Sequence, residues 1–150
     1  MIIREEQRDL FSVPKNYFLM HCISADCKMG AGIAVEFARR GVKKEILKST
    51  NIIEVGTCEF TNATDWLGEF NLITKEKYYQ KPTYETLTAA LQDAKNLCIQ
   101  DFKYEDFEPI KIAMPCIGCG LDKLSWSKVR RIIEQVFQDT NIEILVCRRI

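Results

Sequence analysis

Two segments of the chain carry apolar residues at the spacing of a single helical face. After Thr83, apolar residues recur every three or four positions, at Leu87, Leu91, Ala94 and Cys98. After Ser125 they recur at a similar spacing, at Val129, Ile132, Ile133, Val136 and Phe137. Both segments are predicted to be amphipathic helices. We expect Ser125 to be the N-cap of the second helix, with Leu124 packing back on Val129.

Short apolar runs bounded by turn residues predict strands around these helices. One predicted strand covers residues 17–23, one covers 109–115 and ends at a proline, and the last covers 142–146. The segment 52–75 is expected to form two or three short strands joined by a turn around Gly68. Together these segments would supply the strands of a sheet.

Two further helices are predicted earlier in the chain, over 31–40 and 42–48, with Gly41 at the break between them. Strands that alternate with helices are typical of an α/β sandwich, in which helices cover both faces of a sheet. No repeat, low-complexity stretch or linker interrupts the pattern. We therefore expect residues 1–150 to form a single domain, which suits a chain of this length.

Charge and composition argue against several classes of protein. Lysine plus arginine and aspartate plus glutamate are balanced at 21 each, which argues against a surface dominated by polyanion binding. The first residues include Arg4, Glu5, Glu6 and Arg8, where a secretory leader would need apolar residues. No apolar run approaches the roughly 18 residues of a membrane span. We expect a soluble, cytoplasmic protein without membrane contact.

The seven cysteines are expected to be reduced and mostly buried. Cys116 and Cys119 form a C-x-x-C pair, which raises the question of a zinc or redox site. A structural zinc site would need a second pair of ligands, and the single histidine, His21, stands beside Cys22 instead. A redox pair would open a helix, whereas the helical pattern here begins only at Ser125. We therefore predict no metal and no cofactor.

Glycine-containing loops follow two of the predicted strands, and each precedes a helix. Residues 24–32 follow the strand that ends at Ile23, and residues 115–122 follow the strand that ends at Met114. Glycine lets a backbone approach a phosphate closely, and ligands of open α/β sheets bind at the carboxyl ends of strands. Two such loops together could grip a diphosphate, although a tight turn also explains either one alone. Neither loop matches a P-loop or a dinucleotide fingerprint.

Four segments of the chain resemble the macrodomain family. They are HCISADCKMGAGIAVEF at the first loop, LITK, KPTYETL, and IAMPCIGCGLDKLSW at the second loop. The resemblance covers about residues 7–147 and is strongest to the branch with the terminal ADP-ribose protein glycohydrolase and antitoxins that act on ADP-ribosylated DNA. It implies a three-layer α/β/α sandwich with a central mixed sheet, the macrodomain fold, and ADP-ribose in a cleft across the strand ends.

The resemblance also implies which residues contact ADP-ribose. The adenine amino group is expected at Asp9, with Leu10 beside it, although the family usually has glycine where Arg8 stands. The distal ribose and the phosphates are expected at the two loops, namely at Ser24, Gly30, Ala31, Gly32, Ile117, Gly118, Cys119, Gly120 and Leu121. Cys147 replaces a tyrosine that flanks the adenine in the relatives, so Arg148 is a candidate to stack on the ring.

The glycohydrolase branch further implies a catalytic lysine and a catalytic aspartate, whose counterparts are Lys75 and Asp122. A neutral amine can attack the anomeric carbon and form a Schiff base, and a carboxylate in contact with it can carry the proton. By residue type alone, Lys75 would pass for a surface lysine and Asp122 for a turn residue. Lys77 and Lys81 lie close in sequence, but the LITK segment aligns Lys75.

These features predict an ADP-ribosyl glycohydrolase that removes ADP-ribose from acidic side chains of proteins. Its expected partners are ADP-ribose and a mono-ADP-ribosylated protein, and we expect a monomer. Two alternatives remain open on the sequence. One is removal of ADP-ribose from DNA bases, which would benefit from a basic groove. The other is non-catalytic reading of ADP-ribose, in which Lys75 and Asp122 line the pocket without reacting.

Overall fold

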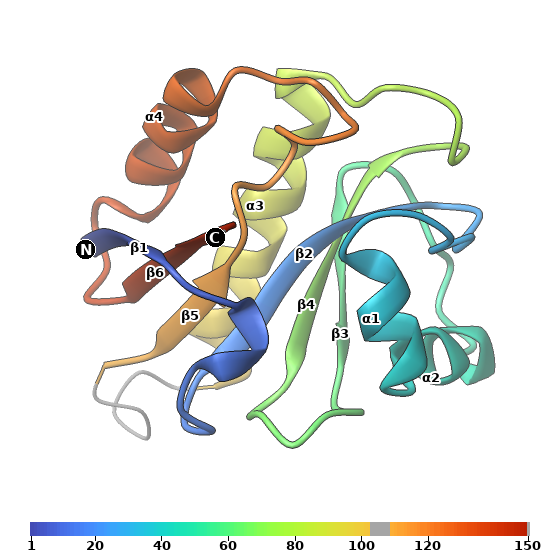
Figure 1. Cartoon of the computed structure of the whole chain (residues 1–150), viewed down its shortest axis with the longest axis horizontal. Helices are drawn as coiled ribbons and strands as arrows, with labels where there is room; N and C mark the ends of the chain where they lie inside the picture. Colours follow the sequence, from blue (N-terminus) through green and yellow to red (C-terminus); the bar gives the residue numbers. More distant parts are fainter. Residues whose placement is uncertain (103–108, 150) are drawn as a thin grey trace.

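The computed structural model describes residues 1–102 and 109–149. Strands and helices alternate along these residues, as Figure 1 shows. The elements are β1 (Ile2–Gln7), the 3-10 helix η1 (Leu10–Ser12), β2 (Phe18–Ser24), α1 (Ala34–Arg39), α2 (Val42–Lys48), β3 (Thr57–Thr61), β4 (Glu69–Lys75), α3 (Tyr84–Gln100), β5 (Lys111–Met114), α4 (Trp126–Phe137) and β6 (Glu143–Arg148).

The strands form a six-stranded mixed sheet in the order β1-β6-β5-β2-β4-β3. Neighbouring strands are parallel except β3 and β4, which are antiparallel. The carboxyl ends of β2, β4, β5 and β6 therefore point to the same edge of the sheet. This is the edge at which open α/β sheets bind their ligands.

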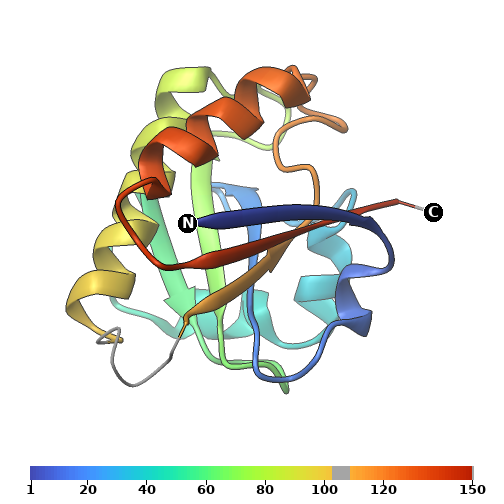
Figure 2. The ribbon, with the colours of Figure 1, turned by 90° about the vertical axis from the view of Figure 1, so that its left-hand side faces the viewer.

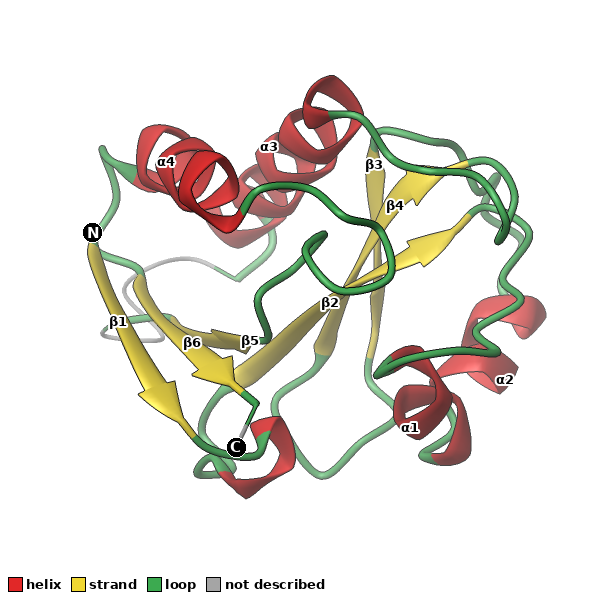
Figure 3. Cartoon of the chain, turned by 45° about the horizontal axis from the view of Figure 1, so that its top comes forward, coloured by secondary structure: helices red, strands yellow, loops and turns green. Residues whose placement is uncertain are grey.

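Helices cover both faces of the sheet, with α3 and α4 on one face and α1 and α2 on the other (Figure 3). The buried apolar residues accordingly form two cores. Leu87 of α3 and Phe137 of α4 belong to one core, and Phe37 of α1 and Ile46 of α2 belong to the other. The predicted three-layer α/β/α sandwich is confirmed. None of the helices in the described residues is long and apolar enough to cross a membrane.

Both amphipathic helices form where their apolar spacing predicts them. Thr83 caps α3, because its side chain accepts a hydrogen bond from the backbone N–H of Thr86 at 3.0 Å. Ser125 stands at the N-cap position of α4, but its hydroxyl lies 3.1 Å from Ser127 Oγ and caps no backbone N–H. Ser125 therefore occupies the predicted N-cap position, but it does not make the capping hydrogen bond to a backbone N–H, because its hydroxyl faces Ser127 instead.

The helix predicted over 31–40 is shorter than expected, because α1 begins only at Ala34. The preceding residues stay in the loop, where Gly32 adopts a left-handed φ of +62° that a helix does not allow. The segment 52–75 forms two strands, β3 and β4, with Gly68 directly before β4. The strand predicted over 109–115 is the shorter β5.

The strand β1 is a feature that the hydrophobic pattern does not predict. It pairs in parallel with β6, with Ile2 opposite Glu143 and Gln7 opposite Arg148 (Figure 2). Because β1 is an edge strand with half-exposed side chains, it tolerates charged residues such as Arg4. An edge strand of this kind lacks the apolar alternation by which sequence patterns reveal strands.

Candidate active site

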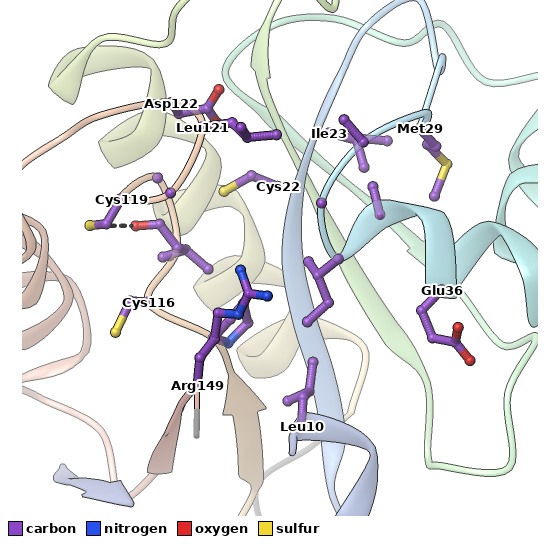
Figure 4. Close-up of a pocket in the computed structure, with 18 of the residues that line it drawn as sticks. Leu10, Cys22, Ile23, Met29, Glu36, Cys116, Cys119, Leu121, Asp122 and Arg149 are labelled. Carbon is purple, nitrogen blue, oxygen red and sulfur yellow. Dashed lines mark hydrogen bonds between the residues drawn. The ribbon is translucent and has the colours of Figure 1, made fainter. Parts of the chain in front are cut away.

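A cleft of about 1480 Å³ opens at the carboxyl ends of the parallel strands, between the loops that follow β2 and β5 (Figure 4). This volume exceeds the roughly 300–1,000 Å³ of ordinary small-molecule pockets and suits an extended ligand. All the residues that the sequence predicts for the site line it, namely Asp9, Leu10, Ser24, Gly30, Ala31, Gly32, Lys75, Ile117, Gly118, Cys119, Gly120, Leu121, Asp122 and Arg148.

The carboxylate of Asp26 holds the loop after β2 in shape. It accepts hydrogen bonds from Ser24 Oγ at 2.5 Å, from the backbone N–H of Tyr78 at 3.0 Å and from that of Lys28 at 3.2 Å. Burial raises the pKa of Asp26, but these hydrogen bonds outweigh it, so the net pKa is lowered. Asp26 is therefore a charged anchor that joins this loop to the segment after β4.

The loop after β5 turns sharply at Gly118, whose φ is +74°. The carbonyl of Gly118 accepts a hydrogen bond from the N–H of Leu124 at 2.7 Å, and a Cβ on Gly118 would lie 3.0 Å from Leu124 Cδ1. Gly120 serves a different purpose, since a Cβ there would meet no atom within 4 Å. The absent side chain of Gly120 leaves backbone open to the cleft, as close approach to a phosphate requires.

The two loops approach each other across the cleft. A Cβ placed on Gly32 would lie 3.7 Å from Leu121 Cδ1. The carbonyl of Leu121 in turn accepts a hydrogen bond of 2.6 Å from Lys81 Nζ. The two loops therefore lie close enough to enclose a bound phosphate group from both sides.

Lys75 and Asp122 touch at one end of the cleft. Lys75 ends β4, Asp122 follows the second loop, and Lys75 Nζ donates a hydrogen bond to Asp122 Oδ1 at 2.7 Å. The two side chains are 15% and 16% exposed. A register shift between β2 and β4 sets Lys75 opposite Ser24, where the first loop begins. The pair therefore adjoins both loops.

Cysteine side chains line the same cleft, namely Cys22, Cys116, Cys119 and Cys147. Burial raises the pKa of Cys119 and of Cys147 to about 11, and it raises the pKa of Cys22 further. Such thiols stay protonated at neutral pH and are poor nucleophiles. Among residues 1–102 and 109–149, no group of three or more His, Cys, Asp or Glu is placed to hold a metal ion. The lysine–aspartate pair is the better candidate for chemistry.

Comparisons with known proteins agree with this geometry. A family model described as the Macro domain matches residues 20–133, which run from β2 into α4. The chain is a macrodomain. The macrodomain is 41% identical over 140 residues to the ADP-ribose glycohydrolases OARD1 of Bos taurus and of Homo sapiens, across 92% of this chain and 86% of theirs.

Solved structures share the macrodomain fold. The macrodomain of Mycobacterium tuberculosis DarG matches with a TM-score of 0.79 at 18% identity, over 97% of each chain. Thermosipho africanus DarTG, solved in complex with ADP-ribose, matches with a TM-score of 0.68 at 16% identity, over 97% of this chain and 41% of that one. At these identities the likeness concerns the fold.

At the other end of the macrodomain cleft, Asp9 begins the helix η1. Its Oδ1 accepts a hydrogen bond from the N–H of Phe11 at 3.0 Å, so the carboxylate caps this short helix. The guanidinium of Arg8 donates to Ser12 Oγ at 3.0 Å and to the Ser12 carbonyl at 2.9 Å. Arg8 thus braces the turn that presents Asp9 and the buried Leu10 to the cleft.

Arg148 lines the macrodomain cleft, but its guanidinium is already engaged. Its Nη1 donates to Glu5 Oε1 at 2.6 Å, while Glu5 Oε2 accepts hydrogen bonds from Trp126 Nε1 at 3.1 Å and from Arg130. Burial raises the pKa of Glu5, but these three donors outweigh it and lower the pKa. This ion pair engages one edge of the Arg148 guanidinium and holds it toward Glu5, on the α4 side of β6.

Several residues of the macrodomain site are missing from the sequence-based prediction, namely Asp26, Lys81 and Arg149. An aspartate after a strand is a common turn residue, which was a usable signal for Asp26. Strand alternation after Cys147 was a signal for Arg149, because residues two apart share a face. Lys81 had no local signal, since its partner Leu121 lies 40 positions along the chain.

Proposed function

We propose that this macrodomain removes ADP-ribose from acidic side chains of proteins, with Lys75 as the nucleophile and Asp122 as the proton carrier. The broader part of the proposal rests on relatives named ADP-ribose glycohydrolase, which are 41% identical over 92% of the chain. The chain is accordingly a hydrolase that binds ADP-ribose. The linkage it cleaves and the roles of the two residues are the finer part.

The contact between Lys75 and Asp122 carries the finer part of the proposal. The 2.7 Å ion pair is largely withdrawn from water, and taking two charges out of water costs free energy that their attraction often fails to return. A pair of this kind is therefore weak support for stability. The pair lies beside both glycine loops, where it can react with the distal ribose of an ADP-ribose bound between these loops.

The first half of the proposed reaction releases the modified side chain. At rest, the ammonium of Lys75 donates a hydrogen bond to the carboxylate of Asp122. Transfer of a proton from Lys75 to Asp122 frees the amine, which attacks C1″ of the distal ribose. The bond from C1″ to the carboxylate oxygen breaks, and Asp122 passes the proton to the leaving carboxylate.

The second half of the reaction regenerates the enzyme. The bond from C1″ to the ring oxygen O4″ breaks, a proton moves from Lys75 Nζ to O4″, and C1″ stays joined to Nζ as a protonated Schiff base. Asp122 takes a proton from water, which adds to C1″. Asp122 then returns this proton to Nζ, the bond from C1″ to Nζ breaks as C1″ becomes an aldehyde whose hydroxyl proton passes to the amine, and the O4″ hydroxyl adds to C1″ to close the ring before free ADP-ribose leaves. Throughout, the glycine loops would hold the diphosphate and so keep C1″ within reach of Lys75.

A parallel hydrolysis assay tests this function. Wild-type protein and Lys75→Ala are each incubated with glutamate-linked ADP-ribosylated protein and with base-linked ADP-ribosylated DNA, and free ADP-ribose is measured. We expect wild type to release ADP-ribose from the protein substrate and Lys75→Ala to release almost none. A wild-type protein that binds ADP-ribose but releases it from neither substrate would be a reader.

Removal of ADP-ribose from DNA bases is the second candidate, and one feature favours it. Tyr78 and Tyr79 line the cleft with 55% and 68% exposure, and Lys28 Nζ lies 5.4 Å from the centre of the Tyr78 ring. Exposed aromatic rings beside lysines are typical of surfaces on which single-stranded bases stack. Faster release from the DNA substrate than from the protein substrate would favour this candidate.

A further inference from the structure

Arginines gather at the end of the cleft away from the catalytic pair, namely Arg8, Arg148 and Arg149. Arg8 is paired with Glu6 at 3.2 Å, and Arg148 is paired with Glu5 at 2.6 Å. Arg149 differs, because its guanidinium forms no ion pair or hydrogen bond with the part of the chain that the structure describes. The cleft therefore contains a cationic plane that is available to a ligand.

The position of Arg149 points it at the ligand space. Its side chain is exposed and reaches from the end of β6 into the cleft, and in Figure 4 it lies between Cys116 of the second loop and Leu10 of η1. Cys147 lines the cleft as well, but it is 3% exposed and offers little surface. Arg149 is thus the large side chain that β6 extends into this part of the cleft.

The alternation of β6 explains why Arg149 and Arg148 differ. Val146 belongs to the core under α3 and α4, whereas Cys147 belongs to the core that contains Leu10. Because successive side chains of a strand point to opposite faces, Arg148 follows Val146 toward Glu5 on the α4 side. Arg149 comes directly after β6 and lines the cleft on the side of Cys147 and Leu10.

We propose that Arg149 forms one wall of the adenine subsite, with the plane of its guanidinium stacked on the base. This inference rests on the proposed function, which sets the distal ribose at the catalytic pair and the diphosphate between the glycine loops. The adenosine then lies at the end where Arg149 and Leu10 face each other. A flat, weakly hydrated guanidinium stacks on rings, and Arg149 offers this plane to a base from one side of the cleft.

A contact with phosphate is the competing role for Arg149, and the chemistry of the cleft argues against it. The two loops already offer glycine backbone to the phosphates, at Gly32 and Gly120. The aromatic ring at this end of the cleft, Phe11, is already packed edge-on against Phe37 and Trp66 and has the guanidinium of Arg40 over it, so Arg149 is the flat group left for a base. The two roles also differ in what they require of the side chain, since stacking needs a plane and phosphate binding needs a charge.

Substitution of Arg149 by residues that keep either property tests the inference. Binding of ADP-ribose is measured by calorimetry for Arg149→Ala, Arg149→Lys and Arg149→Tyr, with Arg131→Ala on the exposed face of α4 as the matched control. We expect Arg149→Ala to raise the Kd about tenfold, since a stacked base is worth roughly 1–3 kcal/mol. Arg149→Tyr should stay within about twofold of wild type, Arg149→Lys should resemble Arg149→Ala, and Arg131→Ala should bind normally.

Turnover supplies a second readout, in which Arg149→Ala should raise KM and leave kcat near wild type, because stacking holds substrate and transition state alike. A Kd for Arg149→Ala within about twofold of wild type would overturn the stacking role. So would full affinity in Arg149→Lys with lost affinity in Arg149→Tyr, which identifies a phosphate contact. If the wild-type protein binds no ADP-ribose, the proposed function itself fails. If the wild-type protein binds ADP-ribose and the Arg149 variants give either of the two contrary results, only the stacking role of Arg149 is overturned.

Discussion

The ion pair of Lys75 and Asp122 is the most consequential contact between single residues in this macrodomain. The two side chains are only 15% and 16% exposed, so each charge is stabilised mainly by its partner and little by water. Removal of one partner leaves a half-buried charge without compensation. Variants at the two positions should therefore lose activity for different reasons.

Lys75→Ala is expected to lower release of ADP-ribose by about a thousandfold or more, because the nucleophile is lost. The Kd for ADP-ribose should change by less than about threefold, since the loops and the far end of the cleft hold most of the ligand. Release is measured with glutamate-linked protein and binding by calorimetry. Lys77→Ala, two positions along the chain, is the matched control and should turn over normally.

Asp122→Ala should also lose turnover, but with its nucleophile intact. If water attack is slowed more than lysine attack, a covalent adduct accumulates. Borohydride reduction followed by mass spectrometry should then place the adduct on Lys75, with Lys77 and Lys81 unmodified. Near-normal turnover by Lys75→Ala, or an adduct on another lysine, would contradict the assigned roles.

At the scale of elements, residues 75–81, at the end of β4 and after it, are hydrogen-bonded to both glycine loops. The backbone carbonyls at Lys75 and Glu76 accept hydrogen bonds from Ala25 and Asp26 at 2.8 and 3.1 Å. The other end of this segment is tied to the second loop, where Lys81 Nζ donates to the carbonyl that directly precedes Asp122. Residues 75–81 are therefore bonded to both loops, on which the separation of Lys75 and Asp122 depends.

Lys81→Met should lower kcat about tenfold, because a loosened second loop lets Asp122 drift from Lys75. The Kd for ADP-ribose should change little, and Lys81→Arg should recover part of the activity by renewing the hydrogen bond. Steady-state kinetics and calorimetry measure the two effects. Lys77→Met is the control, and an equal loss in both variants would show that Lys81 acts by charge alone and not by its contact with the loop.

At the scale of the whole molecule, a chain of hydrogen-bonded polar groups connects His21 in the centre of the sheet to Glu69 at the start of β4. His21 Nε2 donates to Asn71 Oδ1 at 2.5 Å, Asn71 Nδ2 donates to Thr61 Oγ1 at 3.0 Å, and Thr61 Oγ1 donates to Glu69 Oε1 at 2.8 Å. His21 also stacks on Phe37 with ring centres 3.7 Å apart. Burial lowers the pKa of His21 to about 4, although its hydrogen bond with Asn71 opposes the shift.

This histidine predicts how folding stability responds to acid. Unfolded His21 binds a proton near its ordinary pKa of about 6.5, whereas the folded protein resists protonation down to about 4. The contribution of His21 to the free energy of unfolding should therefore be fully present above pH 6.5 and fall by about 3 kcal/mol as the pH drops to 4. Urea unfolding at several pH values measures this slope. His21→Gln, which cannot titrate, should be less stable at pH 7 but show a smaller slope, and an unchanged slope would contradict the prediction.

Residues that act within a few positions of one another were the predictable part of the site. The glycines of both loops line the cleft as expected, whereas Lys75 and Asp122, which line it too, were indicated only by the family resemblance. Residues whose role depends on a distant partner were not predictable. The ion pair that Arg148 forms with Glu5, 143 positions away, is an example, because no pattern near Arg148 in the sequence indicates this partner.

The amino-acid sequence by itself determined the helices, the buried strands and the two glycine loops. Helical and strand periodicity and loop chemistry depend on residues that are near neighbours in the chain, so a local window contains them. The tertiary structure alone decided that β1 pairs with β6, that Lys75 meets Asp122 47 positions away, and that Arg149 rather than Arg148 is left free. These outcomes depend on strand order and on the direction of side chains from separate strands, and no local window contains either.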